Sequence, residues 1–221
     1  MLNEEAVKHA SSLGFELSMM EVIKTQCLPF DINSIDWNET DAIVFTNENA
    51  VSCFFDNEDS KNLLKGKVII STAGKTAKVL TKKGFPPSIT GKNAGEISEK
   101  IVNTGTIRSV LHICGNMVLD ILKTRLEAEK IKYAALIVYQ TIPIKNKKPD
   151  EKFDAILFFS PSGVESYLKY NDIENEFLCC IGDTTAKAFG NRNVIVSQQP
   201  TPESMFETLA NYFDLRLTTY N

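Results

Sequence analysis

The stretch AILFFSPSGVESYL, residues 155–168, carries the pattern that decides the fold. Five apolar residues stand in a row, Ser-Pro-Ser-Gly follows, and a segment with helical spacing comes next. This order is typical of a buried strand that ends where a helix begins. A second stretch, AIVFTNENAVSCFF at residues 42–55, repeats the pattern 113 positions earlier.

Short β-rich runs alternate with helical patterns along the whole chain. The predicted strands are residues 15–23, 42–46, 68–71, 110–113, 133–138, 155–159, 177–181 and 194–196. The predicted helices are residues 4–13, 49–55, 76–83, 95–102, 118–129, 163–170, 184–189 and 203–212. Nearly continuous apolar strands separated by helices indicate parallel sheets covered on both faces. The predicted fold class is therefore α/β.

The chain also repeats itself. STAGKTAKVL (71–80) returns as CIGDTTAKAF (180–189), and TQCLPF (25–30) returns as YQTIPI (139–144). GKNAGEISEKI (91–101) matches QPTPESMFETL (199–209) in pattern. Echoes in the same order at nearly constant spacing indicate an internal duplication of about half the chain. The prediction is two similar lobes.

The two copies begin differently. The second copy opens with the strand 110–113, the turn CGN and a helix, whereas Met1 already stands at the first copy's helix. Either the start codon is placed too far downstream, or this protein lacks the opening strand. Both readings stay open at this point.

Two polar, Pro-containing segments, 26–36 and 141–152, have the composition of linkers. They predict an inserted middle lobe, 37–140, and an outer lobe made of 1–25 plus 153–221. Two crossings between the lobes would leave a cleft, and clefts between domains are where ligands tend to bind.

Composition excludes several classes of protein. The net charge of −4 gives no support for nucleic-acid binding, and no apolar run is long enough to span a membrane. The polar N-terminus is unlike a signal peptide, so a cytoplasmic protein is expected. Five scattered cysteines and two histidines, with no Cys-x-x-Cys, argue against a disulfide framework, a zinc site or a Cys–His nucleophile.

Ligands of parallel α/β sheets bind beyond the carboxyl ends of the strands, next to helix N-termini. Hydroxyl and amide residues are predicted at those junctions. The candidate substrate-binding residues are Thr46, Asn47, Thr76, Asn116, Ser160, Ser162, Thr184 and Thr185. Each one alone is explained as a helix cap. As a set beside free backbone N–H groups, they suit an anionic ligand such as a carboxylate or phosphate.

These positions contain no Ser-His-Asp arrangement, no paired carboxylates and no metal cluster. An enzyme of this kind would work mainly by orienting its substrate. Tyr139, which is expected to end the strand AALIVY at the mouth of the cleft, is the best candidate for a catalytic acid. The alternative is an amphipathic aromatic side chain that covers a strand end.

With these motifs in place, the chain resembles the uroporphyrinogen-III synthase family over nearly its whole length. FTNENAV is similar to the family's F-T-S-x-x-A-V segment, and FFSPSGV to its F-x-S-P-S-G segment. IGDTTAKA resembles I-G-x-T-T-A-x-A, PTPESM resembles the closing P-T-P-E/Q segment, and VYQT follows CGN as the remaining landmark.

The resemblance implies two α/β lobes and a lyase without cofactor or metal, acting in haem and other tetrapyrrole biosynthesis. Its substrate would be hydroxymethylbilane, a linear tetrapyrrole with eight carboxylates. The enzyme would expel the terminal hydroxyl, invert the last pyrrole ring through a spirocyclic intermediate and close the macrocycle. Tyr139 would assist the departure of the hydroxyl, while Thr76, Ser160, Ser162, Thr184 and neighbouring backbone amides would hold carboxylates.

The expected partner is this small molecule alone, with no nucleic acid and no membrane, bound by a monomer. Two alternatives stay open. One is a non-catalytic two-lobed module that closes on a small anion. The other is a degenerate, inactive synthase that lacks its first strand.

Overall fold

The computed structural model describes residues 2–219, and their side chains as far as residue 214. The chain divides into two compact units. The middle unit is Thr25–Thr141, and the outer unit combines Met1–Lys24 with Ile142–Asn221.

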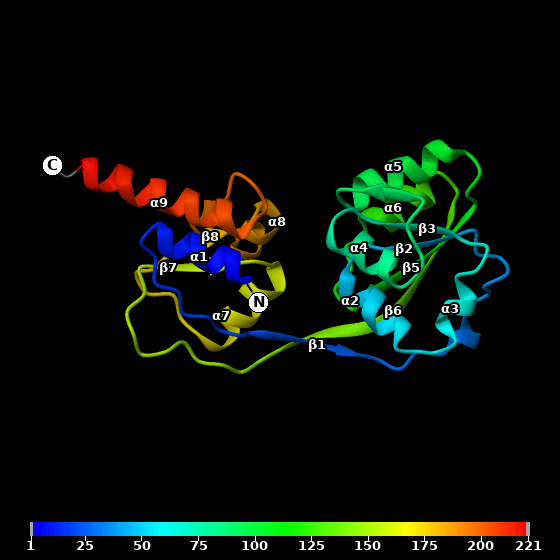
Figure 1. The fold of residues 1–221 in the computed structure, drawn as a ribbon, viewed down its shortest axis with the longest axis horizontal. Helices are drawn as coiled ribbons and strands as arrows, with labels where there is room; N and C mark the ends of the chain where they lie inside the picture. The colour runs from blue at the N-terminus through cyan, green and yellow to red at the C-terminus, as the bar shows by residue number, and fades with distance from the viewer. Residues whose placement is uncertain (1, 220–221) are drawn as a thin grey trace. The chain divides into compact units, whose positions relative to one another are not determined.

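The middle unit is built on a six-stranded sheet (Figure 1). The strand order is β1 (Ile23–Cys27), β6 (Lys132–Pro143), β5 (Ser109–Gly115), β2 (Ala42–Phe45), β3 (Val68–Thr72) and β4 (Ile89–Gly91). The pairs from β6 to β4 are parallel, with Val44 opposite Ile70 on one side and His112 on the other. Every residue of β2 and β5 is buried, which explains why these strands read as unbroken apolar runs.

Helices cover both faces of this sheet (Figure 1). On one face α2 (Glu48–Phe55) and α4 (Lys75–Lys82) enclose a cluster centred on Phe54 and Phe45. On the other face α5 (Ala94–Thr104) and α6 (Ile121–Ala128) bury Ile97, Ile101 and Leu122. The short helices η1 (Ile32–Ser34) and α3 (Ser60–Leu63) lie in connections.

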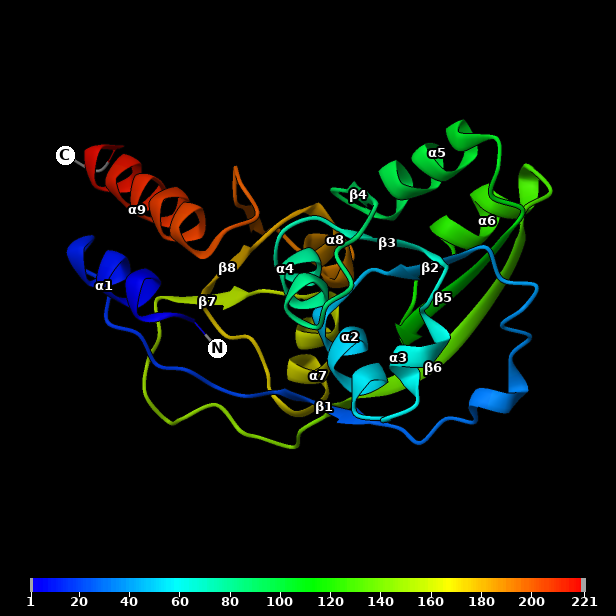
Figure 2. The ribbon, with the colours of Figure 1, turned by 45° about the vertical axis from the view of Figure 1, so that its right-hand side comes forward.

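The outer unit has a three-stranded parallel sheet, β7 (Ala155–Phe158), β8 (Phe177–Cys180) and β9 (Ile195–Val196). One face carries α7 (Pro161–Tyr170), α8 (Asp183–Ala186) and η2 (Lys187–Phe189). On the other face α1 (Glu4–Ser12) and α9 (Pro202–Thr219) lie side by side (Figures 1 and 2), joined by the buried Phe206 and a 3.3 Å contact between His9 and Glu207. None of the described helices is long and apolar enough to cross a membrane.

The two units repeat the same strand arrangement, since β7, β8 and β9 correspond to β2, β3 and β4. The middle sheet continues past β2 to β5, whereas within residues 2–219 no strand pairs with β7 on the corresponding side. Parallel sheets flanked by helices confirm the predicted α/β class.

The predicted strand at residues 15–23 is wrong. Residues 15–22 form no strand, and β1 begins only at Ile23. Phe15 and Leu17, two apolar residues of this segment, pack against α1 and Phe206. Likewise α6 begins at Ile121 rather than at residue 118, and β4 was not expected at all.

A disulfide joins Cys27 of β1 to Cys53 of α2, with their Cα atoms 5.3 Å apart. The sequence argued against a disulfide framework and did not predict this single bond. The separation of 26 positions between the two cysteines gave no sign of pairing, because the position of β1 at the edge of the sheet, beside α2, depends on the tertiary fold. Cys114, Cys179 and Cys180 are free and buried.

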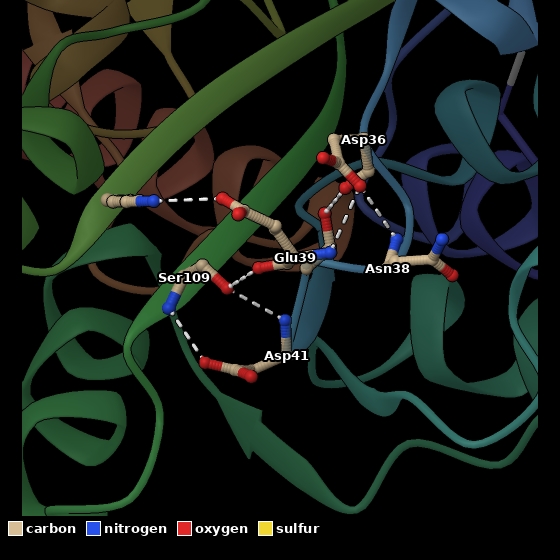
Figure 3. Close-up of polar contacts among 7 residues, drawn as sticks. Asp36, Asn38, Glu39, Asp41 and Ser109 are labelled. Carbon is tan, nitrogen blue, oxygen red and sulfur yellow. Dashed lines mark hydrogen bonds and ion pairs between the residues drawn. The ribbon is translucent and has the colours of Figure 1, made fainter.

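The amino-terminal edge of the middle sheet is fixed by a polar cluster (Figure 3). The Asp41 carboxylate accepts hydrogen bonds from the backbone N–H groups of Arg108 and Ser109, at 2.7 and 2.9 Å. The Ser109 hydroxyl bonds the Glu39 carbonyl, and the Asp41 N–H donates to that hydroxyl. These bonds hold the starts of β2 and β5 together and lower the pKa of Asp41. The candidate site residues lie at the opposite end of the sheet, where the parallel strands have their carboxyl ends. This end is called the carboxyl edge.

Candidate functional site

Three threonines meet at the carboxyl edge of the middle sheet. Thr46 follows β2, Thr72 ends β3, and Thr76 lies in the first turn of α4. The Thr72 hydroxyl lies 3.1 Å from the Thr46 carbonyl oxygen and 2.8 Å from Oγ1 of Thr76. Thr76 is only 5% exposed, so its hydroxyl is engaged inside the protein. Of the three, Thr46 and Thr72 are the more accessible.

Two helices begin beside these threonines. Asn47 is the N-cap of α2, and its Oδ1 accepts a 2.7 Å hydrogen bond from the Asn49 N–H. This bond supports the capping interpretation of Asn47, whose side chain is exposed. Lys75, the first residue of α4, is also exposed. The first-turn N–H groups of both helices and the Lys75 ammonium make this edge favourable for anions.

Tyr139 lies against β5. It is opposite Gly115 in the pairing of β6 with β5, at the point where the register shifts between Cys114 and Gly115. A Cβ atom at Gly115 would overlap the Tyr139 ring, since it would stand 2.8 Å from Cε1 and closer still to Cζ and Cε2. Only glycine lets the phenol ring lie flat on this strand.

The predicted position of Tyr139 at a strand end is wrong. β6 continues to Pro143, because β1 is its neighbour at the sheet edge and Leu28 donates to the Val138 carbonyl. Tyr139 is 9% exposed, and burial, with a smaller contribution from Cys114, raises its pKa. Its hydroxyl has no hydrogen-bond partner among the described residues and is not sealed from solvent. The group is therefore a protonated phenol with a free donor.

Asn116 holds the backbone around Tyr139. Its N–H donates to the Tyr139 carbonyl at 3.1 Å, and its Oδ1 accepts from the Thr141 N–H at 2.9 Å. These two bonds extend the pairing of β5 with β6 by one residue, Asn116, beyond the end of β5. The exposed Asn116 amide NH₂ has no partner among the described side chains and remains free to donate.

The outer unit presents a second row at the carboxyl edge of its own sheet. Ser160 is the N-cap of α7, and its Oγ accepts from the Gly163 N–H at 3.1 Å and lies 3.2 Å from Oγ of Ser162. After β8, Thr184 is exposed in the first turn of α8, while Thr185 is buried at 3% exposure. Thr184 thus faces solvent and Thr185 supports the turn.

The structure therefore brings the predicted residues together in two groups, one in each unit. The middle unit holds Thr46, Asn47, Thr76, Asn116 and Tyr139, and the outer unit holds Ser160, Ser162, Thr184 and Thr185. Within each group the predicted binding residues follow neighbouring strands, and Tyr139 lies inside β6. Thr76 and Thr185 are the two predicted binding residues whose side chains are buried.

Sequence reasoning missed His112, which stands in the middle of β5 at 1% exposure. Its Nε2 lies 2.9 Å from Oγ1 of Thr46, and its Nδ1 lies 3.0 Å from the hydroxyl of Tyr133. Burial lowers its pKa to about 4, so the imidazole is neutral. The available signal was a single polar residue inside the apolar strand VLHIC, which requires hydrogen-bond partners on neighbouring strands.

One group of described side chains has the composition of a metal site: Cys27, Cys53 and Asp56, whose ligand atoms lie within 4.8 Å of one another. The two sulfurs are bonded to each other, however. Because the thiolate is the form of cysteine that binds metals, this group offers no cysteine ligand in its disulfide form.

Comparison with known proteins identifies a family that this chain matches. A family model described as uroporphyrinogen-III synthase HemD matches residues 4–207. The chain is similar in structure to uroporphyrinogen-III synthetase from Helicobacter pylori, with a TM-score of 0.70, 21% identity, and 86% of this chain and 91% of that chain covered. It is also similar to a mutant uroporphyrinogen III synthase from the extremely thermophilic bacterium Thermus thermophilus, with a TM-score of 0.64, 16% identity, and 96% and 94% covered. A search of curated protein sequences finds no match.

Proposed function

This chain belongs to the uroporphyrinogen-III synthase family, and on that premise we propose that it cyclises hydroxymethylbilane to uroporphyrinogen III. The reaction is that of a lyase: the terminal hydroxyl leaves as water, the last pyrrole ring is inverted, and the macrocycle closes. The observation that carries the proposal is the family match over residues 4–207, which spans both units.

Tyr139 is proposed as the acid that assists the departing hydroxyl. The proposal is supported by its free phenol O–H and by its raised pKa, which keeps the proton on the oxygen at neutral pH. The ring lies on Gly115 and its backbone is bonded to Asn116, so the hydroxyl is held at a defined place. A fixed donor suits a reaction in which orientation rather than strong acidity is required.

The remaining residues are proposed to bind substrate carboxylates. In the middle unit these are the Thr46 hydroxyl, the Asn116 amide and the N–H groups at the starts of α2 and α4, where Asn47 and Thr76 lie. In the outer unit they are Ser160, Ser162 and Thr184, with the adjoining N–H groups of α7 and α8, where Thr185 lies. Since Thr76 is buried, its backbone N–H rather than its hydroxyl is proposed as the donor. Thr185 is also buried and its N–H donates to the Gly182 carbonyl at 3.0 Å, so its proposed part in binding is to support the turn that presents Thr184.

The test is incubation of the purified chain with freshly generated hydroxymethylbilane, oxidation of the products, and chromatographic separation of type I and type III uroporphyrin isomers. We expect type III product. A product mixture identical to the enzyme-free control, with type I isomer alone, would overturn the proposal and favour the inactive alternative.

We also propose that the enzyme is a cytoplasmic monomer that binds no nucleic acid. The net charge of −4 supports the absence of nucleic-acid binding. Sedimentation of the purified chain at micromolar concentration checks the oligomeric state, and a dimer would contradict it.

A further inference from the structure

A hydrogen-bonded chain of three side chains, the buried His112 between the half-buried Tyr133 and Thr46, crosses three neighbouring strands of the middle sheet. The Tyr133 hydroxyl on β6 contacts Nδ1 of His112 on β5 at 3.0 Å, and Nε2 of His112 contacts Oγ1 of Thr46, directly after β2, at 2.9 Å. The chain ends at Thr46, a half-buried residue on the carboxyl edge. It therefore connects the interior to a residue of the candidate site.

The chain has a direction, because His112 is neutral. Burial depresses its pKa to about 4, and the neutral imidazole has one N–H donor and one acceptor nitrogen. Two arrangements satisfy both hydrogen bonds. In the first, Tyr133 donates to Nδ1 and Nε2–H donates to Thr46. In the second, Thr46 donates to Nε2 and Nδ1–H donates to Tyr133.

The phenol of Tyr133 favours the first arrangement. Its hydroxyl has no other hydrogen-bond partner among the described residues, so in the second arrangement its hydrogen would have no acceptor there. Burial raises the pKa of Tyr133 to about 12, which keeps the donor hydrogen in place. Since a phenol is a stronger hydrogen-bond donor than the aliphatic hydroxyl of Thr46, the arrangement in which Tyr133 donates to Nδ1 is preferred.

The direction decides what the Thr46 hydroxyl can do. If Nε2–H donates to Oγ1, the hydrogen of Thr46 points away from His112 and is available to a ligand. If Thr46 donates to Nε2, it can only accept, and an anionic ligand finds no hydrogen there. A carboxylate is an acceptor alone, so its binding requires the first arrangement.

We propose that Tyr133 and His112 are positioning residues that hold the Thr46 hydroxyl as a hydrogen-bond donor toward a carboxylate of the substrate. Tyr133 fixes the Nε2–H tautomer of His112, and His112 orients Thr46. The inference rests on the proposed function for the identity of the ligand, but the direction of the chain does not depend on it.

The first test measures the direction alone. Nitrogen-15 chemical shifts of the His112 ring in the full chain at neutral pH report which nitrogen carries the hydrogen. We expect Nε2–H in the wild type, and a shift toward the other tautomer in Tyr133→Phe. A Nδ1–H tautomer or an imidazolium in the wild type would overturn the inference. This result is obtained without substrate, so it stands or fails separately from the proposed function.

The second test is a double-mutant cycle on the kinetics. Tyr133→Phe should raise KM roughly fivefold with kcat nearly unchanged, since about one hydrogen bond to the ligand is weakened. It should also lower the melting temperature, because Nδ1 of the buried His112 loses its partner. In a Thr46→Val background the same substitution should have no further effect on KM. An equal effect in both backgrounds would show that Tyr133 acts through packing and would overturn the inference.

Tyr167→Phe is the matched control. Tyr167 is a buried tyrosine of α7 whose hydroxyl has no partner among the described residues, so the substitution removes a phenol oxygen without breaking a hydrogen bond. We expect it to leave KM and the His112 tautomer unchanged. If the wild type forms no type III isomer at all, the proposed function fails, and the tautomer measurement still decides the inference.

Discussion

The aromatic ring of Tyr139 lies directly on the α-carbon of Gly115, with no room for a Cβ atom between them. The contact occurs at the register shift between Cys114 and Gly115, next to the end of β5. Irregularities of this kind re-aim a side chain near functional sites. The catalytic position proposed for Tyr139 therefore depends on a glycine one strand away.

Gly115→Ala tests this dependence. The added methyl group must displace the Tyr139 ring, which we expect to cost about 1–3 kcal/mol of unfolding free energy and to lower turnover as the phenol moves. Urea unfolding and initial rates of type III isomer formation measure the two effects.

Gly182→Ala is the stability control, because no atom lies within 4 Å of a Cβ built there and its backbone is extended. Its free energy of unfolding should lie within about 0.5 kcal/mol of that of the wild type. If Gly115→Ala were as stable and as active as the wild type, Tyr139 would not need its place over Gly115.

Tyr139→Phe removes only the hydroxyl. Since that oxygen has no hydrogen-bond partner among the described residues, we expect the melting temperature to stay the same. Turnover should fall about 100-fold if the phenol assists the leaving hydroxyl, a typical contribution of general acid catalysis. Rates measured at saturating hydroxymethylbilane check this, and an unchanged kcat removes Tyr139 from its proposed role.

The strand-to-helix junctions could be predicted from sequence because they are local. At Ser160 the N-cap, the following Pro161 and the preceding buried strand are contiguous in the chain, and the structure begins α7 at that point. Asn47 follows the same rule at α2. The residues proposed to bind anions were found because helix N-termini and strand ends are visible in one sequence.

Long-range pairing was not visible in the same way. β1 forms only because it lies beside β6, a strand distant in sequence. The same pairing extends β6 beyond Tyr139 to Pro143. The disulfide and the contact of His112 with Thr46 depend on the same tertiary placement. The missed features are those whose partners are distant in sequence.

The disulfide between Cys27 and Cys53 should contribute measurably to stability. A cross-link over a sequence separation of 26 lowers the conformational entropy of the unfolded chain, which stabilises the folded state by about 3 kcal/mol. We expect a reductant to lower the urea midpoint of the wild type accordingly. Cys27→Ser, at an exposed position, should match the reduced wild type and show no response to reductant. A wild type insensitive to reductant would mean that the bond contributes nothing.

His112 should make stability depend on pH in a defined window. Its folded-state pKa is about 4 and its ordinary value is 6.5, so between these values the unfolded chain binds more protons than the folded one. Stability is then complete above pH 6.5 and falls as the pH is lowered toward 4. The full shift corresponds to about 3 kcal/mol.

Carboxyl groups such as Asp41, whose pKa is lowered in the folded state, also make the protein less stable at low pH. This loss occurs at a lower pH than the loss caused by His112, because the ordinary pKa of a carboxyl group lies below that of histidine. The contribution of His112 is therefore isolated by comparing the unfolding free energies of the wild type and His112→Gln at about pH 7, 5.5 and 4.5, which span the window in which the imidazole titrates only when unfolded. The glutamine keeps two polar groups in the strand but does not titrate. We expect the difference between the two proteins to shrink as the pH falls, because only the wild type must neutralise an imidazole that is protonated when unfolded. A constant difference over this range would show that His112 is not held neutral by its burial.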